Sequence, residues 1–159
     1  LYERKFKFVD DELFSFYKKG RNKTEKWYIV KLVLDKGTGY KKFGFNVKGK
    51  IKTFRFHRVV YYAHNNDWDI YDSSKENVID HIDGTRTNNH ISNLRNVTNQ
   101  ENQFNTRCKG YCFHKGTGKY QARIILNRKF IHIGLFDTEA DAHEAYIQKK
   151  AEVHIIQAR

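Results

Sequence analysis

The sequence predicts an α+β fold: a β-rich N-terminal part, then a strand–loop–strand–helix core, then a small three-stranded sheet with one helix. Three observations carry this prediction. Apolar and alternating stretches before residue 60 favour strands, and a Gly- and Asn-rich loop separates two short apolar segments in the middle. Further short strands then precede an Ala-rich helix. At 159 residues the chain can form one ordinary domain or two small ones.

The N-terminal part is predicted to be mainly β-strand. Trp27–Leu34 is apolar and β-branched, which is typical of a strand. Tyr40–Val47 and Ile51–Arg58 alternate and are separated by a short turn at Gly49, so they predict a hairpin. Arg58–His64 is expected to begin a short helix or to form another buried segment.

The middle of the chain predicts two short strands, a long loop and a helix. The strands are Val78–Ile82 and Leu94–Val97, and the polar residues Asp83–Asn93 form the loop between them. Thr98 and Glu101 have the Thr-x-x-Glu spacing of a capping box, in which each side chain accepts a hydrogen bond from the backbone of the other. A helix should therefore begin at Thr98.

After Arg107 the pattern changes to three short strands and a final helix. These elements are expected at Tyr111–Lys115, Tyr120–Leu126, Lys129–Phe136 and Ala140–Val153. Small Ala side chains allow such a helix to lie close against a sheet. We therefore divide the chain into domains of residues 1–107 and 108–159.

The charge of the chain favours a polyanionic partner. Lys and Arg number 30 against 18 Asp and Glu, a formal net charge of +12, and basic proteins bind phosphates with counterion release. A ribosomal or membrane-surface protein would share this excess. Residues 61–107 differ, with 4 Lys or Arg against 7 Asp or Glu. This acidic stretch suits a metal site, although chance clustering of surface charge would look the same.

Cysteine usage and hydropathy indicate an intracellular protein that is not secreted. Cys108 and Cys112 are too few for a disulfide framework, and no apolar run approaches the roughly 18 residues of a membrane span. No signal peptide is visible, although the chain begins at Leu1 without Met, which leaves open a trimmed or an incomplete N-terminus. Cys108, Cys112 and His114 do not form a strong zinc pattern, and we interpret them as structural or incidental.

The residues that could carry chemistry lie in the middle segment. Asp80 and His81 are adjacent, so on a strand they point to opposite faces, and one can bind a metal while the other reaches a water. Asn93 lies 12 residues after His81, and Asn102 lies nine after Asn93. If the helix packs across the strands, Asn102 returns to Asp80. A lone Asp-His pair is usually only hydrogen-bonded, but four residues at this spacing favour a functional site.

This segment resembles the ββα-metal core of HNH endonucleases, especially the phage homing type with His-Asn-Asn in place of His-Asn-His. The resemblance rests on DHIDG, NNHISNL and VTNQEN in fixed order within residues 78–107, and it extends upstream over residues 39–64. It implies that Asp80 and Asn102 are ligands of a divalent metal. It also implies that His81 is the general base, and that Asn93 holds the loop and His81 in place.

General chemistry agrees with these roles. A neutral imidazole, with a reference pKa of about 6.5, can accept a proton from water near neutral pH. A carboxylate and an amide oxygen suit Mg²⁺ or Mn²⁺ better than Zn²⁺, and two protein ligands leave positions for water and phosphate. We interpret Asp83-Gly84 as the turn that opens the loop and Glu101 as the helix cap. His57 could assist at the site, although a hydrogen-bonded structural role is favoured.

Residues 109–154 resemble an APETALA2-type DNA-binding domain through KGY, GKYQARI, IHIGLFDT and EADAHEAY. In that family a three-stranded sheet enters the major groove and the helix supports it from behind. Alternation should place one face on the helix, made by Tyr120, Ala122, Ile124 and Leu126. Expected DNA contacts, each of which could also be an ordinary solvated side chain, are His114, Lys115, Lys119, Gln121, Arg123 and Arg128. The tryptophan and most arginines of the plant DNA face are missing, so no plant target preference carries over.

These features together predict a metal-dependent enzyme that hydrolyses double-stranded DNA, by nicking or by double-strand cleavage. The phage resemblance implies a homing role in the cytoplasm of the host cell. The alternative is a non-catalytic, sequence-specific DNA-binding protein on an HNH scaffold, but such a protein has no need of His81 as a base. RNA is a weaker alternative substrate. The oligomeric state is left open, with a monomer as the default.

Overall fold

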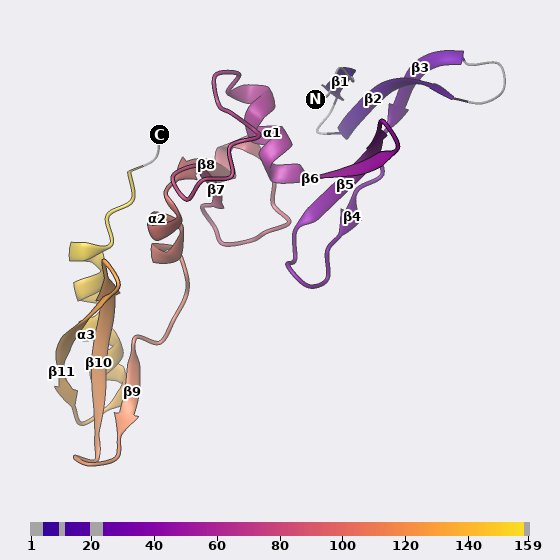
Figure 1. The fold of residues 1–159 in the computed structure, drawn as a ribbon. Helices are drawn as coiled ribbons and strands as arrows, with labels where there is room; N and C mark the ends of the chain where they lie inside the picture. Colours follow the sequence, from indigo (N-terminus) through magenta and orange to yellow (C-terminus); the bar gives the residue numbers. More distant parts are fainter. Residues whose placement is uncertain (1–4, 10–11, 20–23, 158–159) are drawn as a thin grey trace. The chain divides into compact units, whose positions relative to one another are not determined.

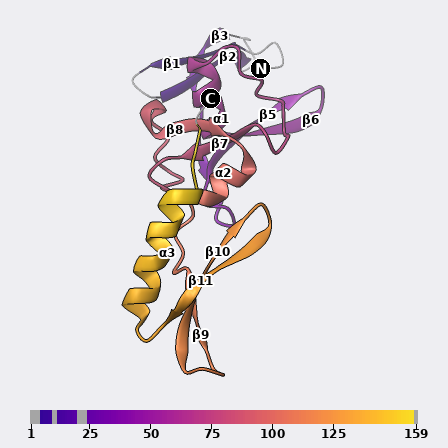
Figure 2. The same cartoon turned by 90° about the vertical axis from the view of Figure 1, so that its left-hand side faces the viewer.

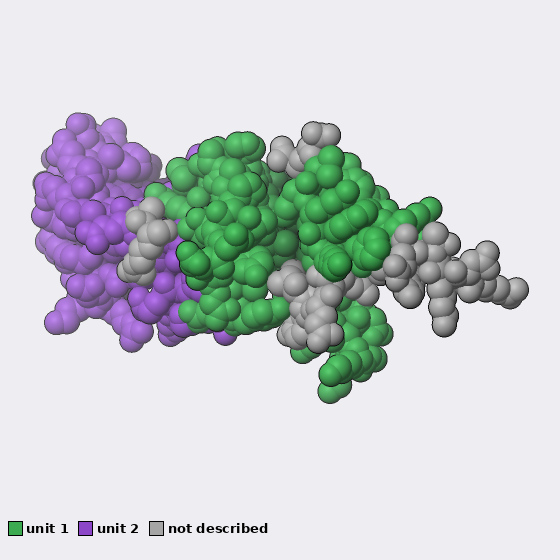
Figure 3. All heavy atoms as spheres, turned by 90° about the horizontal axis from the view of Figure 1, so that it is seen from above, with its two compact units in different colours: residues 1–72, 81–95 green, residues 73–80, 96–159 purple. Residues whose placement is uncertain are grey.

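The structure is a computed structural model that describes residues 5–9, 12–19 and 24–157 (Figure 1). Its fold is α+β, as predicted, with β-rich N-terminal sheets, a central strand–loop–strand–helix segment and a three-stranded sheet packed on a helix. Contacts divide the chain into two compact units, residues 1–72 with 81–95 and residues 73–80 with 96–159 (Figure 3). The domains of residues 1–107 and 108–159, assigned from motifs, are a different division and stay a prediction.

The first sheet contains β1 (Lys5–Val9), β2 (Glu12–Lys19) and β3 (Thr24–Ile29), all antiparallel, in the order β1-β2-β3. Period-2 alternation turns Phe6 and Phe8 to one side, where they meet aromatic rings of the next elements. Phe6 lies 5.4 Å from Phe45, centroid to centroid. These aromatic contacts join the first sheet to the second.

The single strand predicted over Trp27–Leu34 is wrong, because the chain changes sheets within this apolar run. β3 ends at Ile29, which pairs with Phe14 of β2. The separate strand β4 (Val33–Leu34) pairs instead with β5 of the second sheet. Hydrophobicity predicts burial, but it does not say which neighbouring strand supplies the hydrogen bonds.

The predicted hairpin is confirmed as β5 (Lys41–Val47) and β6 (Lys50–Arg55). Its turn residues Lys48 and Gly49 have φ of 50° and 82°, the left-handed pair of a type I′ turn. The second strand ends at Arg55 rather than Arg58, because α1 (Phe56–His64) begins there. Helical periodicity then buries Phe56, Val59 and Val60 against the sheets.

The central segment consists of β7 (Val78–His81), a 3₁₀ turn at Ile91–Asn93, β8 (Leu94–Val97) and α2 (Asn99–Phe104). β7 and β8 form a two-stranded sheet, as expected. The predicted capping box is present: Thr98 Oγ1 accepts from the Glu101 amide at 3.1 Å, and Glu101 Oε2 accepts from the Thr98 amide at 2.7 Å. Two donors of the first turn are thereby satisfied.

The C-terminal module contains β9 (Tyr111–His114), β10 (Lys119–Leu126), β11 (Lys129–Phe136) and α3 (Glu139–Val153), in the sheet order β11-β10-β9. The helix α3 lies along one face of the sheet (Figure 2). Ala122 and Ile124 of β10 are 0% and 2% exposed on this face, which confirms the predicted alternation. α3 begins at Glu139, one residue before the predicted start, because Thr138 caps it.

Close packing of this module depends on Gly110. Its φ is +75°, and a Cβ placed there would lie 1.9 Å from the ring of Tyr146 on α3. Only glycine therefore lets the chain pass this ring on its way into β9. Among the described residues, no helix is both long and apolar enough to cross a bilayer.

Candidate functional site

His81, at the end of β7, is held in a buried position. Its side chain is 3% exposed, and its Nε2 lies 3.0 Å from Asn89 Oδ1. An amide oxygen can only accept, so Nε2 carries the proton and Nδ1 is the basic nitrogen. The amide nitrogen of Asn89 donates to Thr87 O at 3.2 Å, which turns Oδ1 toward the imidazole. The loop after β7 thus sets the tautomer of His81.

A second buried histidine packs against His81. His57 of α1 is 3% exposed, and its ring centroid lies 5.0 Å from that of His81 and 4.7 Å from that of Tyr40. Burial, followed by the charge of His81, lowers the pKa of His57 to about 3. Its Nδ1 is buried without a partner among the described residues. His57 is therefore neutral and packs against His81. The sequence favoured a hydrogen-bonded structural role for His57, but its Nδ1 makes no hydrogen bond to the described residues.

Two guanidinium groups lie near the same rings. Arg55 and Arg86 lie 5.1 Å and 5.2 Å from the ring centroid of Tyr40, whose ring is 5.8 Å from that of His81. Arg86 also donates to Thr38 O at 2.8 Å, which holds this side chain of the long loop. Sequence reasoning did not single out either arginine, because only the fold brings them to Tyr40.

Asn93 organises the loop between the two strands. Its side chain donates to Asp83 Oδ1 and to Asn88 O, both at 2.9 Å, and accepts from the Asp83 amide at 3.0 Å. The carbonyl of Asn93 also accepts from the Ile82 amide at 2.9 Å. Since Ile82 directly follows His81, these bonds join the two ends of the loop next to the imidazole.

Asp83 is used by the loop itself. Hydrogen bonds from Asn88, from the Thr85 amide and from Asn93 lower the pKa of Asp83 to about 2. Thr85 N lies 2.6 Å from Asp83 Oδ1, which is the geometry of an Asx turn. This agrees with the interpretation of Asp83-Gly84 as the opening turn of the loop.

Asp80 faces the end of α2. This carboxylate is 6% exposed, and Asn105 Nδ2 lies 3.2 Å from its Oδ1 and 3.1 Å from its Oδ2. Asn105 is the C-cap of α2, three residues after Asn102, and residues three apart are neighbours on a helix surface. Asn105 was not predicted from the sequence, although its i, i+3 spacing from Asn102 was a usable signal.

The Asp80 carboxylate offers oxygen ligands of the kind that a hard cation such as Mg²⁺ or Mn²⁺ prefers. Asn105 turns its amide nitrogen toward this carboxylate, so it acts as a hydrogen-bond donor to Asp80. Within the described residues, no three His, Cys, Asp or Glu side chains gather to hold a metal. Asp80 and Asn102 as metal ligands, with His81 and Asn93 as base and brace, therefore stay predictions.

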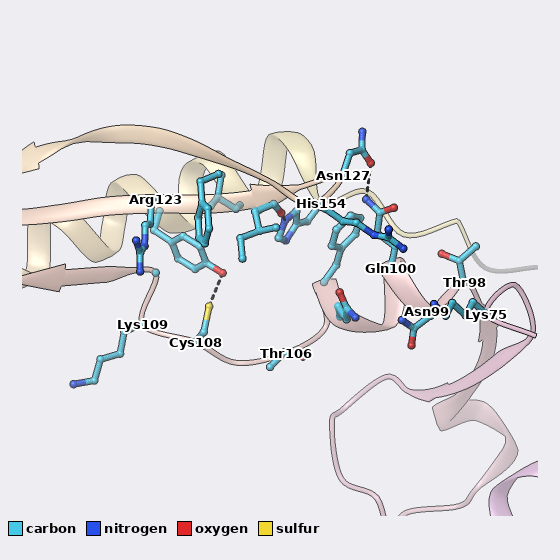
Figure 4. Close-up of a pocket in the computed structure, with 18 of the residues that line it drawn as sticks. Lys75, Thr98, Asn99, Gln100, Thr106, Cys108, Lys109, Arg123, Asn127 and His154 are labelled. Carbon is cyan, nitrogen blue, oxygen red and sulfur yellow. Dashed lines mark hydrogen bonds between the residues drawn. The ribbon is translucent and has the colours of Figure 1, made fainter.

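The two cysteines have different surroundings. Cys108 Sγ lies 2.8 Å from Tyr146 OH (Figure 4), and burial together with this contact raises the pKa of Tyr146. Cys112 lies within β9. His114 Nδ1 is 3.0 Å from Thr117 Oγ1 in the following turn.

The predicted DNA-contacting residues lie at the end of β9, along β10 and in the two turns of the C-terminal sheet. Arg123 is exposed with its guanidinium 4.9 Å from the Phe130 centroid, and Gln121 Nε2 lies 3.2 Å from His132 Nδ1. Lys119 forms an exposed ion pair with Asp137 at 3.0 Å. Lys115 and Arg128 are exposed in the turns. The structure adds His132 to this face through its contact with Gln121.

Comparison with known proteins finds one family over the central segment. The model of the HNH endonuclease family matches residues 54–104, about a third of the chain. The chain is also similar to the solved structure described as "DNA binding and cleavage by the HNH homing endonuclease I-HmuI", at 30% identity and a TM-score of 0.38. That match covers 61% of this chain and 51% of the other, so it spans about half the length of that protein. No curated protein matches the chain.

Proposed function

We propose that this protein is a metal-dependent endonuclease that hydrolyses phosphodiester bonds of double-stranded DNA, and that it is a phage-type homing enzyme acting in the host cytoplasm. The observation that carries the proposal is the family match over residues 54–104, which contains the buried His81 and the loop around it. The net charge of +12 supports a polyanionic substrate. The resemblance of residues 109–154 to APETALA2-type domains supports the choice of DNA.

His81 is proposed to be the general base. The bond to Asn89 leaves Nδ1 as the nitrogen that can take a proton from water. A neutral His57 adds no positive charge that would oppose this proton uptake. Asn93 would keep the loop closed, so that the imidazole is already oriented before substrate binds.

Asp80 and Asn102 are proposed to hold the divalent ion, and Asn105 to orient Asp80. Bound Mg²⁺ or Mn²⁺ would supply charge neutralisation at the phosphate. Because Asp80 and His81 are consecutive residues of a strand, their side chains leave the backbone on opposite faces. The guanidinium groups of Arg55 and Arg86 would add positive charge on the His81 side.

The C-terminal sheet is proposed to hold DNA in the major groove. The face opposite α3 presents exposed or half-buried polar side chains from β10, namely Lys119, Gln121 and Arg123. The end of β9 adds His114, and the two turns add Lys115 and Arg128. Such a face can reach both phosphates and base edges, whereas the opposite face is filled by α3.

A plasmid cleavage assay tests the proposed activity. Supercoiled DNA should be nicked or linearised with Mg²⁺ and left intact with EDTA. His81→Ala should lower the rate by about 10²–10⁴-fold, the usual contribution of a general base, with DNA affinity unchanged. His90→Ala is the matched control, since His90 lies in the same loop but is exposed and bonded to Ser92. DNA binding without cleavage by the unaltered protein would favour the non-catalytic alternative.

A further inference from the structure

The helix α2 is too short to hold its own position. It has six residues, Asn99–Phe104, and isolated helices below about 12–15 residues are marginal in water even with good sequences. The capping box satisfies two backbone N–H donors at the start of the helix, but these bonds do not orient the helix relative to the rest of the fold. The orientation of α2 must therefore come from contacts with other parts of the fold.

The helix presents two different sides. Asn102 and the C-cap Asn105 lie on the side of Asp80, since Asn105 contacts that carboxylate. Gln100 and Phe104 are four residues apart and share another side, which makes the contacts described next. One side of α2 thus carries the proposed metal ligand, and the other side contacts the residues that support the helix.

The support comes from the C-terminal end of the chain. The ring of His154 stacks on Phe104, with a centroid distance of 4.0 Å and an interplanar angle of 9°. The other end of the same imidazole is fixed to the module, because Nε2 lies 3.0 Å from Ile125 O of β10. The amide of Gln157 donates to Glu101 Oε1 at 3.0 Å, while the other oxygen of that carboxylate closes the capping box.

Other contacts lie at the two ends of α2: the Asn99 amide donates to Lys75 O at 2.6 Å, and Lys150 Nζ donates to Thr106 O at 3.1 Å just beyond the helix. An open cavity of about 900 Å³ is lined by residues of α2 and of the C-terminal module, including Gln100, Arg123 and His154 (Figure 4). The helix is therefore not supported by a continuous core on this side. One further bond joins Gln100 Nε2 to Asn127 Oδ1 at 2.7 Å, but both side chains are exposed.

We propose that residues 154–157 are a positioning element for the nuclease helix, and that His154 is its principal side chain. The segment connects the end of β10 to α2, so the DNA-binding module sets the direction in which Asn102 points. Metal binding would then depend on residues that are remote in sequence from the HNH motif. The inference rests on the proposed function only in assigning Asn102 to the metal.

The test compares three variants of the full chain. His154→Ala removes the stack on Phe104, and His154→Phe keeps an aromatic ring there and loses only the bond to Ile125 O. The phenyl ring also replaces a buried Nδ1 that has no partner among the described residues, so this nitrogen is lost without breaking a bond. Ile155→Ala is the matched control, because the neighbouring Ile155 is 63% exposed.

The first readout is amide hydrogen exchange without metal, which does not depend on nuclease activity. His154→Ala should speed exchange at Asn102–Asn105 by at least about tenfold, corresponding to about 1.4 kcal/mol, and leave β10 unchanged. The second readout is Mn²⁺ affinity by calorimetry, which should fall in His154→Ala and recover in His154→Phe. Ile155→Ala should match the unaltered protein in both readouts.

Unchanged exchange in α2 together with unchanged Mn²⁺ affinity would overturn the proposal. Equal loss of protection in β10 would also overturn it, because His154 would then stabilise the module in general. If the unaltered protein neither cleaves DNA nor binds Mn²⁺, the proposed function fails, and the exchange data alone still decide whether His154 positions α2.

Discussion

Acid should destabilise the protein through His57, by an amount that follows from the burial of this side chain. Burial, and after it the charges of His81, Arg55 and Arg58, lowers the pKa of His57 from 6.5 to about 3. The unfolded chain therefore takes up a proton near pH 6.5, whereas the folded chain does so only near pH 3. The stability that comes from neutral His57 is complete above pH 6.5 and is lost as the pH falls toward 3.

The expected loss is about 3 kcal/mol between pH 7 and pH 4, since each pKa unit of difference corresponds to about 1.4 kcal/mol. Urea unfolding at both pH values would measure it in the unaltered protein and in His57→Phe. Phenylalanine keeps a ring against Tyr40 and His81 but cannot be protonated. Carboxylates titrate in both proteins, so their contribution cancels in the difference.

His57→Phe should lose about 3 kcal/mol less than the unaltered protein on acidification. The exposed His90 provides the control, and His90→Phe should behave like the unaltered protein. Equal losses in the unaltered protein and in His57→Phe would show that His57 is not held neutral by its surroundings. The account of a neutral ring beside His81 would then be refuted.

Three further predictions concern the metal, the module and DNA recognition. Asn102→Ala should abolish Mn²⁺ binding in calorimetry, whereas Asn105→Ala should only weaken it, and the reverse order would exchange their roles. Gly110→Ala should lower the free energy of unfolding by about 2–4 kcal/mol in denaturant titrations, because a methyl group there meets the ring on α3 at positive φ. A loss below 1 kcal/mol would contradict this packing. Arg123→Ala should weaken binding to the preferred duplex by about 1–3 kcal/mol and relax the preference at one base pair. Lys119→Ala should weaken binding to all duplexes alike, and it should lower the slope of log affinity against log salt concentration by about one. Equal effects of Arg123→Ala on specific and random duplexes would identify it as a phosphate contact.

Much of the fold followed from local patterns. The Lys48-Gly49 turn, the capping box at Thr98 and the alternation in β10 each depend on residues close together in sequence. Such signals depend on only a few neighbouring residues, and the structure confirms the elements that they predicted. The strands β1 and β2 were not predicted individually, and the run at residues 27–34 was read as one strand instead of two.

The candidate site, like the fold, was predicted from the sequence only in part. Asp80, His81, Asn93 and Asn102 were chosen from their spacing, and they lie in elements of the predicted kinds. The contact of Asn105 with Asp80, and the packing of His57 against His81, were not predicted. Both contacts form where a helix packs against a strand that is distant in sequence. The motif contains no information about the angle at which these two elements pack.

The sequence by itself determined the kinds of element, the order of the chemistry-bearing residues and the basic charge that favours a phosphate-rich partner. Only the tertiary structure decided which strand pairs with which, that His57 is buried and neutral, and that His154 stacks on α2. The physical reason is that burial and long-range contacts depend on chain segments far apart in sequence. Periodicity can show which side of an element is apolar, but the partner that covers that side is chosen by the packing of the whole fold.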